Sequence, residues 1–262
     1  MSVDLTGKRA LVTGGSGDIG RAICATLGRA GARVAFTYFS DREGADRTVA
    51  ALVEASPEVN SEPVVLRGNF ADEKSTAGVL AQALARLERV DIFVSNAASG
   101  VLRPLSELKA RHFQWTLDVN ARAFFAIAQG LTRDPPGGSP AMGRGGRIIA
   151  LSSLGAARAI PQYTVVGASK AALESLARHL ALDLGPRGIT VNAVSPGIVE
   201  TKALQAFPNR EELLDVAARR TPLGRLTRPD DIAAVVLFLC SDAAAMIHGQ
   251  TIHVDGGYTV VA

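Results

Sequence analysis

The sequence predicts an α/β protein with a doubly wound parallel sheet of about seven strands and helices on both faces. Short runs rich in β-branched residues alternate with longer segments that carry apolar residues at helical spacing, such as Ile19, Ile23 and Leu27. This alternation favours parallel strands joined by helical crossovers. With 262 residues, 47% of them hydrophobic and 20% charged, the chain suits one large folded domain.

The expected strands follow one another without a repeat or a linker, so we expect a single Rossmann-type domain over residues 1–262. The segments between strands carry apolar residues at helical spacing, as in Leu173, Leu176 and Leu180. The strands are expected at Arg9–Thr13, Arg33–Tyr38, Pro63–Arg67, Val90–Ser95, Arg147–Ser152, Ile189–Ser195 and Thr251–Val254.

Composition argues against several classes of function. The net charge is only +3 and the basic residues form no long run, so no nucleic-acid partner is expected. Cys24 and Cys240 lie in apolar helical patterns and are expected to be buried free thiols, and no metal-ligand spacing occurs. The longest apolar run, Ile232–Cys240, is too short to span a bilayer, and Met1–Gly7 has no signal-peptide core. We therefore expect a cytoplasmic protein with no membrane contact.

A glycine-rich segment, Thr13–Gly20, follows the first expected strand and opens the first helix. Glycines there let the backbone turn tightly and approach a pyrophosphate, which the N–H groups at the helix start stabilise. Gly15 to Gly20 also fits the pattern G-x-G-x-x-G, which at this position predicts a dinucleotide cofactor. The expected contacts are Gly14, Ser16, Gly17, Asp18, Ile19 and Gly20.

The end of the second strand bears on the choice of cofactor. A cofactor with a free 2′-hydroxyl usually meets Asp or Glu at this position. Here Tyr38 stands there, with Ser40 and Arg42 nearby, and Asp41 is the one residue that argues the other way. The charge balance favours NADPH over NADH; the alternative is that Arg42 is only a solvated residue of the first helical turn.

Tyr163 and Lys170 are seven positions apart. In an α-helix this spacing is almost two turns, so both side chains leave one face, about 10 Å apart along the axis. A phenol and an ammonium on one face suit a carbonyl substrate and a sugar hydroxyl that lie side by side. Taken alone the pair also fits a surface tyrosine and a solvated lysine.

The ordered series of motifs resembles the short-chain dehydrogenase/reductase superfamily over essentially the whole chain, which implies a nicotinamide cofactor. Most members have Tyr four residues before Lys, where this chain has Val166. Six residues between Tyr and Lys resemble the enoyl-acyl-carrier-protein reductases, and the flanking strings are similar to their NADPH-dependent branch. The motifs are Thr13–Gly20, Ser95–Ala98, Val119–Asn120, Ser152–Ser153, Tyr163 with Lys170, Pro196–Gly197 and Val254–Gly257.

The resemblance implies transfer of a hydride from NADPH to the β-carbon of an α,β-unsaturated acyl thioester. Tyr163 would hydrogen-bond the thioester oxygen as negative charge develops, and Lys170 would hold the nicotinamide ribose. Ser153, or Ser152 instead, would support the oxyanion. Asn120 resembles the residue that bends its helix and helps to relay protons through water in ketone-reducing relatives. Further cofactor contacts are implied at Asn69, Phe70, Asn96, Ala97, Ala98, Pro196, Gly197, Ile198 and Thr201.

Some positions depart from the superfamily pattern and leave a ketone substrate open. Asp18 replaces a glycine, and its carboxylate is unfavourable beside a pyrophosphate unless it caps the helix with its side chain turned away. Asn69 stands for the usual Asp at the adenine site, and Ser153 stands where many enoyl reductases have a second Tyr. The pair Pro196–Gly197 follows the general superfamily. The alternatives are a carbonyl reductase acting on a 3-oxoacyl thioester or a polyketide-like ketone, and a dinucleotide-binding regulator without turnover.

Substrate specificity is expected from a lid at about residues 202–228. This segment mixes apolar residues with Arg210, Arg219, Arg220 and Arg225, which would lie near the phosphopantetheine or an acidic carrier surface. The alternative is an amphipathic helix pair packed on the body. The partners implied are an acyl thioester on acyl-carrier protein or coenzyme A, and a second copy of the chain in a homotetramer or homodimer.

Overall fold

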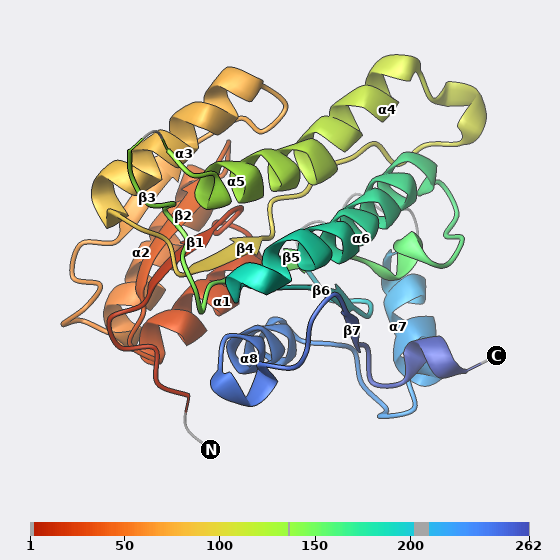
Figure 1. Ribbon diagram of the computed structural model, residues 1–262. Helices are drawn as coiled ribbons and strands as arrows, with labels where there is room; N and C mark the ends of the chain where they lie inside the picture. The colour runs from red at the N-terminus through yellow and green to blue at the C-terminus, as the bar shows by residue number, and fades with distance from the viewer. Residues whose placement is uncertain (1–2, 136, 202–209, 262) are drawn as a thin grey trace.

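The computed structural model describes residues 3–135, 137–201 and 210–261, and it confirms the predicted fold class. Seven parallel strands form one sheet in the order β3-β2-β1-β4-β5-β6-β7 (Figure 1). The order reverses between β1 and β4, which leaves a crevice at the carboxyl ends of these strands. The strands are β1 Arg9–Val12, β2 Arg33–Tyr38, β3 Val64–Arg67, β4 Ile92–Ser95, β5 Arg147–Leu151, β6 Thr190–Pro196 and β7 Thr251–Val254.

Helices cover both faces of the sheet and bury one apolar cluster on each (Figure 1). One cluster lies under α3, α5 and α6, and the other lies under α1, α2 and α8. The thiols of Cys24 and Cys240 are buried, as expected. The helices are α1 Asp18–Arg29, α2 Arg42–Ala55, α3 Glu73–Leu87, α4 Ala110–Leu117, α5 Ala123–Thr132, α6 Thr164–Leu184, α7 Arg210–Arg220 and α8 Pro229–Leu239.

The carboxyl ends of β1 and β5 come one residue before the predicted ends, and the released residues have polar side chains that serve the crevice. Thr13 accepts hydrogen bonds from the loop after β4, and Ser152 donates to a carboxylate on α6. Within the described residues, no helix is both long and apolar enough to cross a bilayer.

A π turn, Asp118–Arg122, separates α4 from α5. Such turns occur mostly as single insertions in α-helices and frequently at functional sites. This one contains Asn120, a predicted site residue, which is fully buried.

Candidate active site

The glycine-rich loop between β1 and α1 has no room for a side chain at its tightest points. Gly14 has φ of +67°, and a Cβ there would lie 2.7 Å from Cα of Ala97. A Cβ on Gly20 would lie 2.2 Å from the carbonyl oxygen of Gly14. Both positions therefore require glycine, and the loop with the start of α1 forms a cradle that suits a pyrophosphate. Ser16, Gly17 and Ile19 belong to the same turn and first helical residues.

Asn96 and Thr13 join this loop to the end of β4. Nδ2 of Asn96 donates to the carbonyl oxygens of Thr13 at 3.1 Å and Gly14 at 2.9 Å. Oγ1 of Thr13 accepts from the backbone N–H groups of Asn96 and Ala97, each at 3.0 Å. Asn96, Ala97 and the exposed Ala98 thus lie where the strand order reverses, the usual ligand position in doubly wound sheets.

Asp18 is the first residue of α1, and Gly17 is the N-cap. Asp18 therefore does not occupy the capping position, the arrangement in which its carboxylate would be turned away from a pyrophosphate. Instead its Oδ1 accepts from Nη2 of Arg21 at 2.7 Å, one turn further along. Arg21 offsets the charge, and a carboxylate in the first turn also interacts favourably with the helix dipole.

Tyr38 and Arg42 lie together between β2 and α2. The guanidinium of Arg42 is 5.8 Å from the centre of the Tyr38 ring, and its Nε pairs with Asp46 at 3.0 Å. Asp41, the residue that argued against NADPH, is the N-cap of α2 and accepts from a backbone N–H of the first turn at 2.8 Å. Its carboxylate is therefore directed to the helix, while Arg42 and the exposed Ser40 remain at the strand end.

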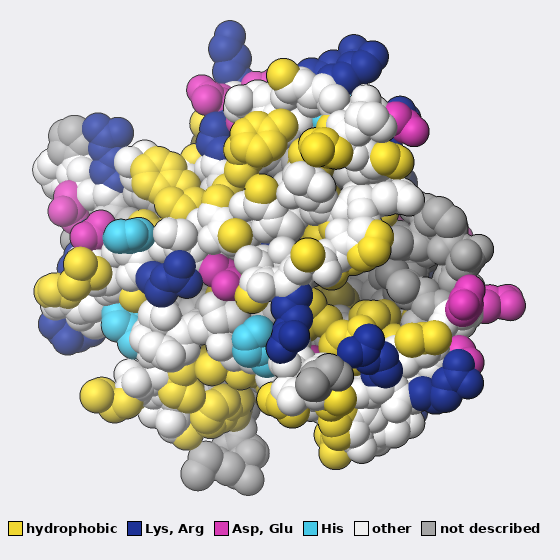
Figure 2. All heavy atoms as spheres, turned by 90° about the vertical axis from the view of Figure 1, so that its right-hand side faces the viewer, with side chains coloured by type: hydrophobic (Ala, Val, Ile, Leu, Met, Phe, Trp, Pro, Cys, Tyr) yellow, Lys and Arg dark blue, Asp and Glu magenta, His cyan; other side chains and the backbone are white. Residues whose placement is uncertain are grey.

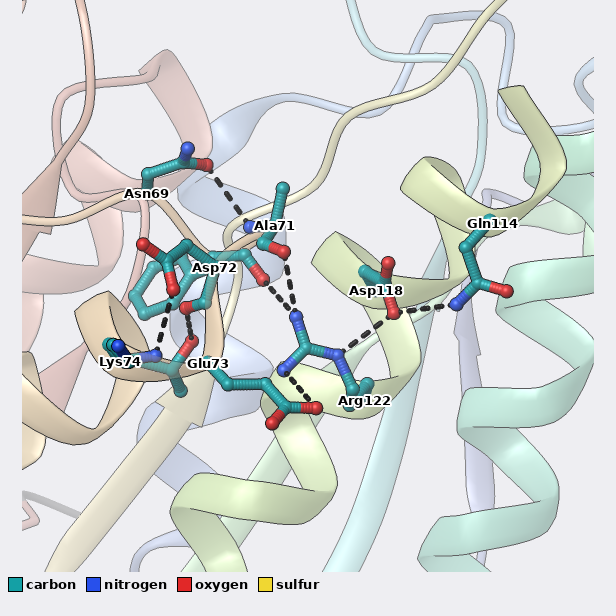
Figure 3. A network of polar contacts seen from close by, with 10 residues as sticks. Asn69, Ala71, Asp72, Glu73, Lys74, Gln114, Asp118 and Arg122 are labelled. Atoms are coloured by element: carbon teal, nitrogen blue, oxygen red, sulfur yellow. Dashed lines mark hydrogen bonds and ion pairs between the residues drawn. The ribbon is translucent and has the colours of Figure 1, made fainter. Parts of the chain in front are cut away.

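Arg122 holds the loop that carries Asn69 and Phe70 (Figure 3). Its Nη2 donates to the carbonyl oxygens of Phe70 at 3.2 Å and Ala71 at 2.9 Å, and its Nε donates to Asp118 at 2.8 Å. Oδ1 of Asn69 accepts from the N–H of Ala71 at 3.1 Å. The side chain of Phe70 is buried in the core, so a contact with a cofactor there rests on its backbone.

Asn120 ties the π turn to two neighbouring elements. Its Oδ1 accepts from the N–H of Ser99 at 2.9 Å, and its Nδ2 donates to the carbonyl of Ser99 and to Oγ of Ser169 on α6. The amide thus joins the loop after β4 to the helix that carries Lys170. These bonds give Asn120 a structural role beside the expected one.

Tyr163 immediately precedes α6, which begins at Thr164, so the predicted helix starts one residue later than the tyrosine. Its hydroxyl donates to Oγ of Ser153 at 3.1 Å, just beyond the end of β5. A Cβ on Gly155 would lie 2.4 Å from two atoms of the tyrosine ring, so this glycine makes room for it. Burial raises the pKa of Tyr163, partly offset by the bond to Ser153, and the phenol is protonated at neutral pH.

Lys170 reaches the same strand end from α6. Its Nζ donates to the carbonyl oxygen of Leu151 at 2.6 Å, two residues before Ser153. Burial lowers the pKa of Lys170 to about 8, and the charge of Glu174 opposes that effect. Ser152, between these partners, donates to Oε1 of Glu174 at 2.5 Å. The structure therefore brings Tyr163, Lys170, Ser152 and Ser153 together.

The segment after β6 packs against the end of β7. The N–H of Gly197 donates to the carbonyl oxygen of Val254 at 2.9 Å. A Cβ on Gly197 would lie 2.7 Å from Oγ1 of Thr227 and 2.9 Å from Cα of Asp255. Pro196, Gly197, Ile198 and Thr201 lead from the carboxyl end of β6, where the cofactor contacts were predicted.

The predicted lid falls partly outside the described residues, which omit 202–209. In its described part, Arg219 pairs with Asp215 at 2.5 Å, and Arg225 pairs with Asp231 at 2.6 Å. These two arginines are engaged within the protein. Figure 2 looks at this side of the molecule and shows hydrophobic side chains interspersed with separate Lys and Arg side chains.

Sequence reasoning missed three residues of the site. No sequence pattern assigns a role to Gly155, although its missing side chain makes room for the tyrosine ring. Glu174 is one of two acidic residues on the amphipathic helix α6, and Arg122 acts through backbone carbonyls. No residue-type pattern marks the last two.

Comparisons with known proteins agree with this geometry. A family model described as enoyl-(acyl carrier protein) reductase matches residues 15–259. The 1-cyclohexenylcarbonyl-CoA reductase of Streptomyces collinus is 36% identical over 96% of this chain and 87% of its own, and versicolorin reductase 1 of Aspergillus parasiticus is 35% identical over 97% of each. A short-chain dehydrogenase from Burkholderia cenocepacia in complex with NADP has a TM-score of 0.83 at 33% identity, over 97% of this chain and 99% of that one.

These matches span nearly the whole chain and confirm the resemblance drawn from its motifs. The chain therefore belongs to the short-chain dehydrogenase/reductase superfamily, within the family described as enoyl-(acyl carrier protein) reductase, and is an oxidoreductase of that type.

Proposed function

We propose that this protein is an NADPH-dependent enoyl-thioester reductase. The observation that carries the proposal is the position of Tyr163, whose hydroxyl lies 3.1 Å from Ser153 at the end of β5. The position four residues before Lys170 holds Val166, which is buried and has no hydroxyl. A Cβ on Gly100 would lie 2.2 Å from the Val166 side chain, so this position is packed against the loop after β4. Tyr163 is thus the phenol available to the substrate.

The residues present fit a bound NADPH. The glycine cradle at Gly14 and Gly20 suits its pyrophosphate, and Arg42 offers a cation to a 2′-phosphate. Lys170 lies where it would hold the nicotinamide ribose, and Asn69 would lie near the adenine. The solved relative in complex with NADP supports this choice.

Bound NADPH would supply the hydride to the β-carbon of the substrate. The phenol of Tyr163 would donate a hydrogen bond to the thioester oxygen and stabilise the enolate charge that develops there. Because its pKa is raised by burial, the phenol keeps its proton at neutral pH. The ammonium of Lys170 would add a positive field beside it, and Ser153 would orient the phenol.

A carbonyl reductase is the second candidate, and two observations favour it. One relative is named versicolorin reductase, and the pair Pro196–Gly197 follows the general superfamily. The test is consumption of NADPH with a crotonyl thioester and with an acetoacetyl thioester, each repeated with NADH. We expect rapid oxidation of NADPH with the crotonyl substrate; rapid turnover of the acetoacetyl substrate alone would contradict the proposal.

The carrier and the assembly form part of the same proposal. One relative is named for a coenzyme A thioester, and the family description names acyl-carrier protein, so each carrier of the crotonyl group should be assayed. We propose that residues 202–228 cover the acyl chain and that the protein works as a homotetramer or homodimer in the cytoplasm. Light scattering after gel filtration tests the assembly, and a monomer would contradict it.

A further inference from the structure

The carboxylate of Glu174 is bonded into the site, yet the proposed chemistry does not use it. Glu174 is one helical turn beyond Lys170 on α6. Its Oε1 accepts from Oγ of Ser152 at 2.5 Å, and Ser152 is only 5% exposed. This distance is typical of a hydroxyl that donates to a carboxylate. Such hydrogen bonds are about twice as strong as those between two neutral groups.

The two neighbours of Ser152 are the partners of the two residues that carry the chemistry. The carbonyl of Leu151 accepts from Nζ of Lys170 at 2.6 Å, and the hydroxyl of Ser153 accepts from Tyr163 at 3.1 Å. One bond at the middle of three consecutive residues therefore restrains both acceptors. Small displacements of positioning groups cost much of the rate, about 100-fold for 1 Å.

We infer that Glu174 is a positioning residue of this site, which anchors the segment Leu151–Ser153 through Ser152 and places a negative charge beside Lys170. The inference rests on the roles proposed above for Tyr163 and Lys170. Because these roles serve alkene and ketone reduction alike, it does not depend on which of the two thioesters is the substrate.

The charge of Glu174 affects the pKa of Lys170, and the other polar groups around the lysine are neutral. The end of β5 presents the neutral hydroxyls of Ser152 and Ser153, and Tyr163, just before α6, adds its protonated phenol. The π turn contributes the neutral amide of Asn120, which is bonded to Ser169 next to Lys170. Among the residues that the structure describes, Glu174 is the one whose charge is found to act on the pKa of this lysine. The burial that lowers the pKa of Lys170 to about 8 would lower it further without that charge.

Two variants separate the two parts of the inference. Glu174→Gln keeps an oxygen that can accept from Ser152 and removes the charge, whereas Ser152→Ala removes the bond and keeps the charge. Asp183→Asn is the matched control, because it removes one charge from an exposed position on the same helix. For each protein, kcat and kcat/KM are measured across the neutral and alkaline range with the thioester that the wild type reduces, and folding is checked by circular dichroism.

We expect the alkaline limb of kcat/KM, which falls as Lys170 loses its proton, to move about half a pH unit or more to lower pH in Glu174→Gln. Asp183→Asn is expected to leave it in place. Ser152→Ala is expected to lower kcat about tenfold with little change in the KM for NADPH.

The inference is overturned if folded Glu174→Gln has the same alkaline limb of kcat/KM as the wild type. It is also overturned if Ser152→Ala keeps the full kcat of the wild type. If Glu174→Gln does not fold, the kcat of Ser152→Ala alone decides whether the inference holds. If the wild type does not reduce the crotonyl thioester, the proposed function is wrong. The variants at Glu174 and Ser152 can then still be compared with the wild type on the acetoacetyl thioester.

Discussion

At the scale of single residues, Tyr163 is oriented by the backbone around it. Gln162, directly before it, has φ of +60°, a region that residues other than glycine rarely adopt. Gly155 leaves space for the ring, and a Cβ on Gly167 would lie 2.6 Å from the carbonyl oxygen of Gly155. Helical periodicity placed the tyrosine and Lys170 on one face, but these backbone contacts are what bring the phenol to Ser153.

Gly155→Ala should lower turnover with little loss of NADPH affinity, because the new methyl group would lie 2.4 Å from the ring of Tyr163. We expect a fall in kcat of about 10- to 100-fold from misplacement of the phenol. Gly78→Ala on α3 is the control, since a Cβ there meets nothing within 4 Å. It should preserve kcat and stabilise the fold by up to about 1 kcal/mol, because alanine has the better helix propensity. A Gly155→Ala enzyme with normal kcat would show that the ring position is not critical.

Tyr163→Phe tests the phenol directly. Removing one hydrogen-bond donor to a developing oxyanion costs about 10²- to 10³-fold in kcat, and we expect a loss of that order. The dissociation constant of NADPH, measured by fluorescence titration, should change little. Lys170→Met should impair both quantities, because the ammonium would hold the cofactor as well as shape the field. Near-normal turnover of Tyr163→Phe would remove the tyrosine from the mechanism.

At the scale of elements, the sequence predicted what periodicity and β-branched runs encode. It placed all seven strands and the helix of Lys170, because buried strands and amphipathic helices leave regular apolar patterns. It did not predict the π turn Asp118–Arg122, since a one-residue change in hydrogen-bond register leaves no such pattern. The sequence did not predict the bonds of Arg122 to backbone carbonyls either. Every residue has a backbone carbonyl, so the residue types do not show which carbonyls accept a bond.

Arg122→Met should weaken cofactor binding more than it slows the reaction. The arginine holds the carbonyls of Phe70 and Ala71, so its loss would loosen the loop expected to contact the adenine. Hydrogen bonds to charged groups contribute about 1.5–3 kcal/mol, and we expect the dissociation constant of NADPH to rise about tenfold. Arg86→Met, an exposed change on α3, is the control. Equal NADPH affinity in the two variants would contradict a role for Arg122 at the loop.

At the scale of the whole molecule, the strand order explains why residues so far apart in sequence meet. The reversal between β1 and β4 brings the glycine loop, the loop after β4 and the end of β5 to one edge of the sheet. The order of the motifs along the chain was sufficient to identify the superfamily. It did not determine the substrate, because one fold supports many different reactions.

The same arrangement predicts how the cofactor stabilises the molecule. A ligand that binds only the folded state, present at 100 times its dissociation constant, stabilises that state by about 2.7 kcal/mol. Because we expect NADPH to bind more tightly than NADH, it should raise Tm more than an equal concentration of NADH. Arg42→Glu should abolish this difference, because a carboxylate would repel the 2′-phosphate at the end of β2. Arg33→Glu makes the same charge change at the opposite, exposed end of that strand and should leave the difference intact. If Arg42→Glu lowers the effects of NADPH and NADH equally, Arg42 does not read the phosphate, and the preference must come from another part of the crevice.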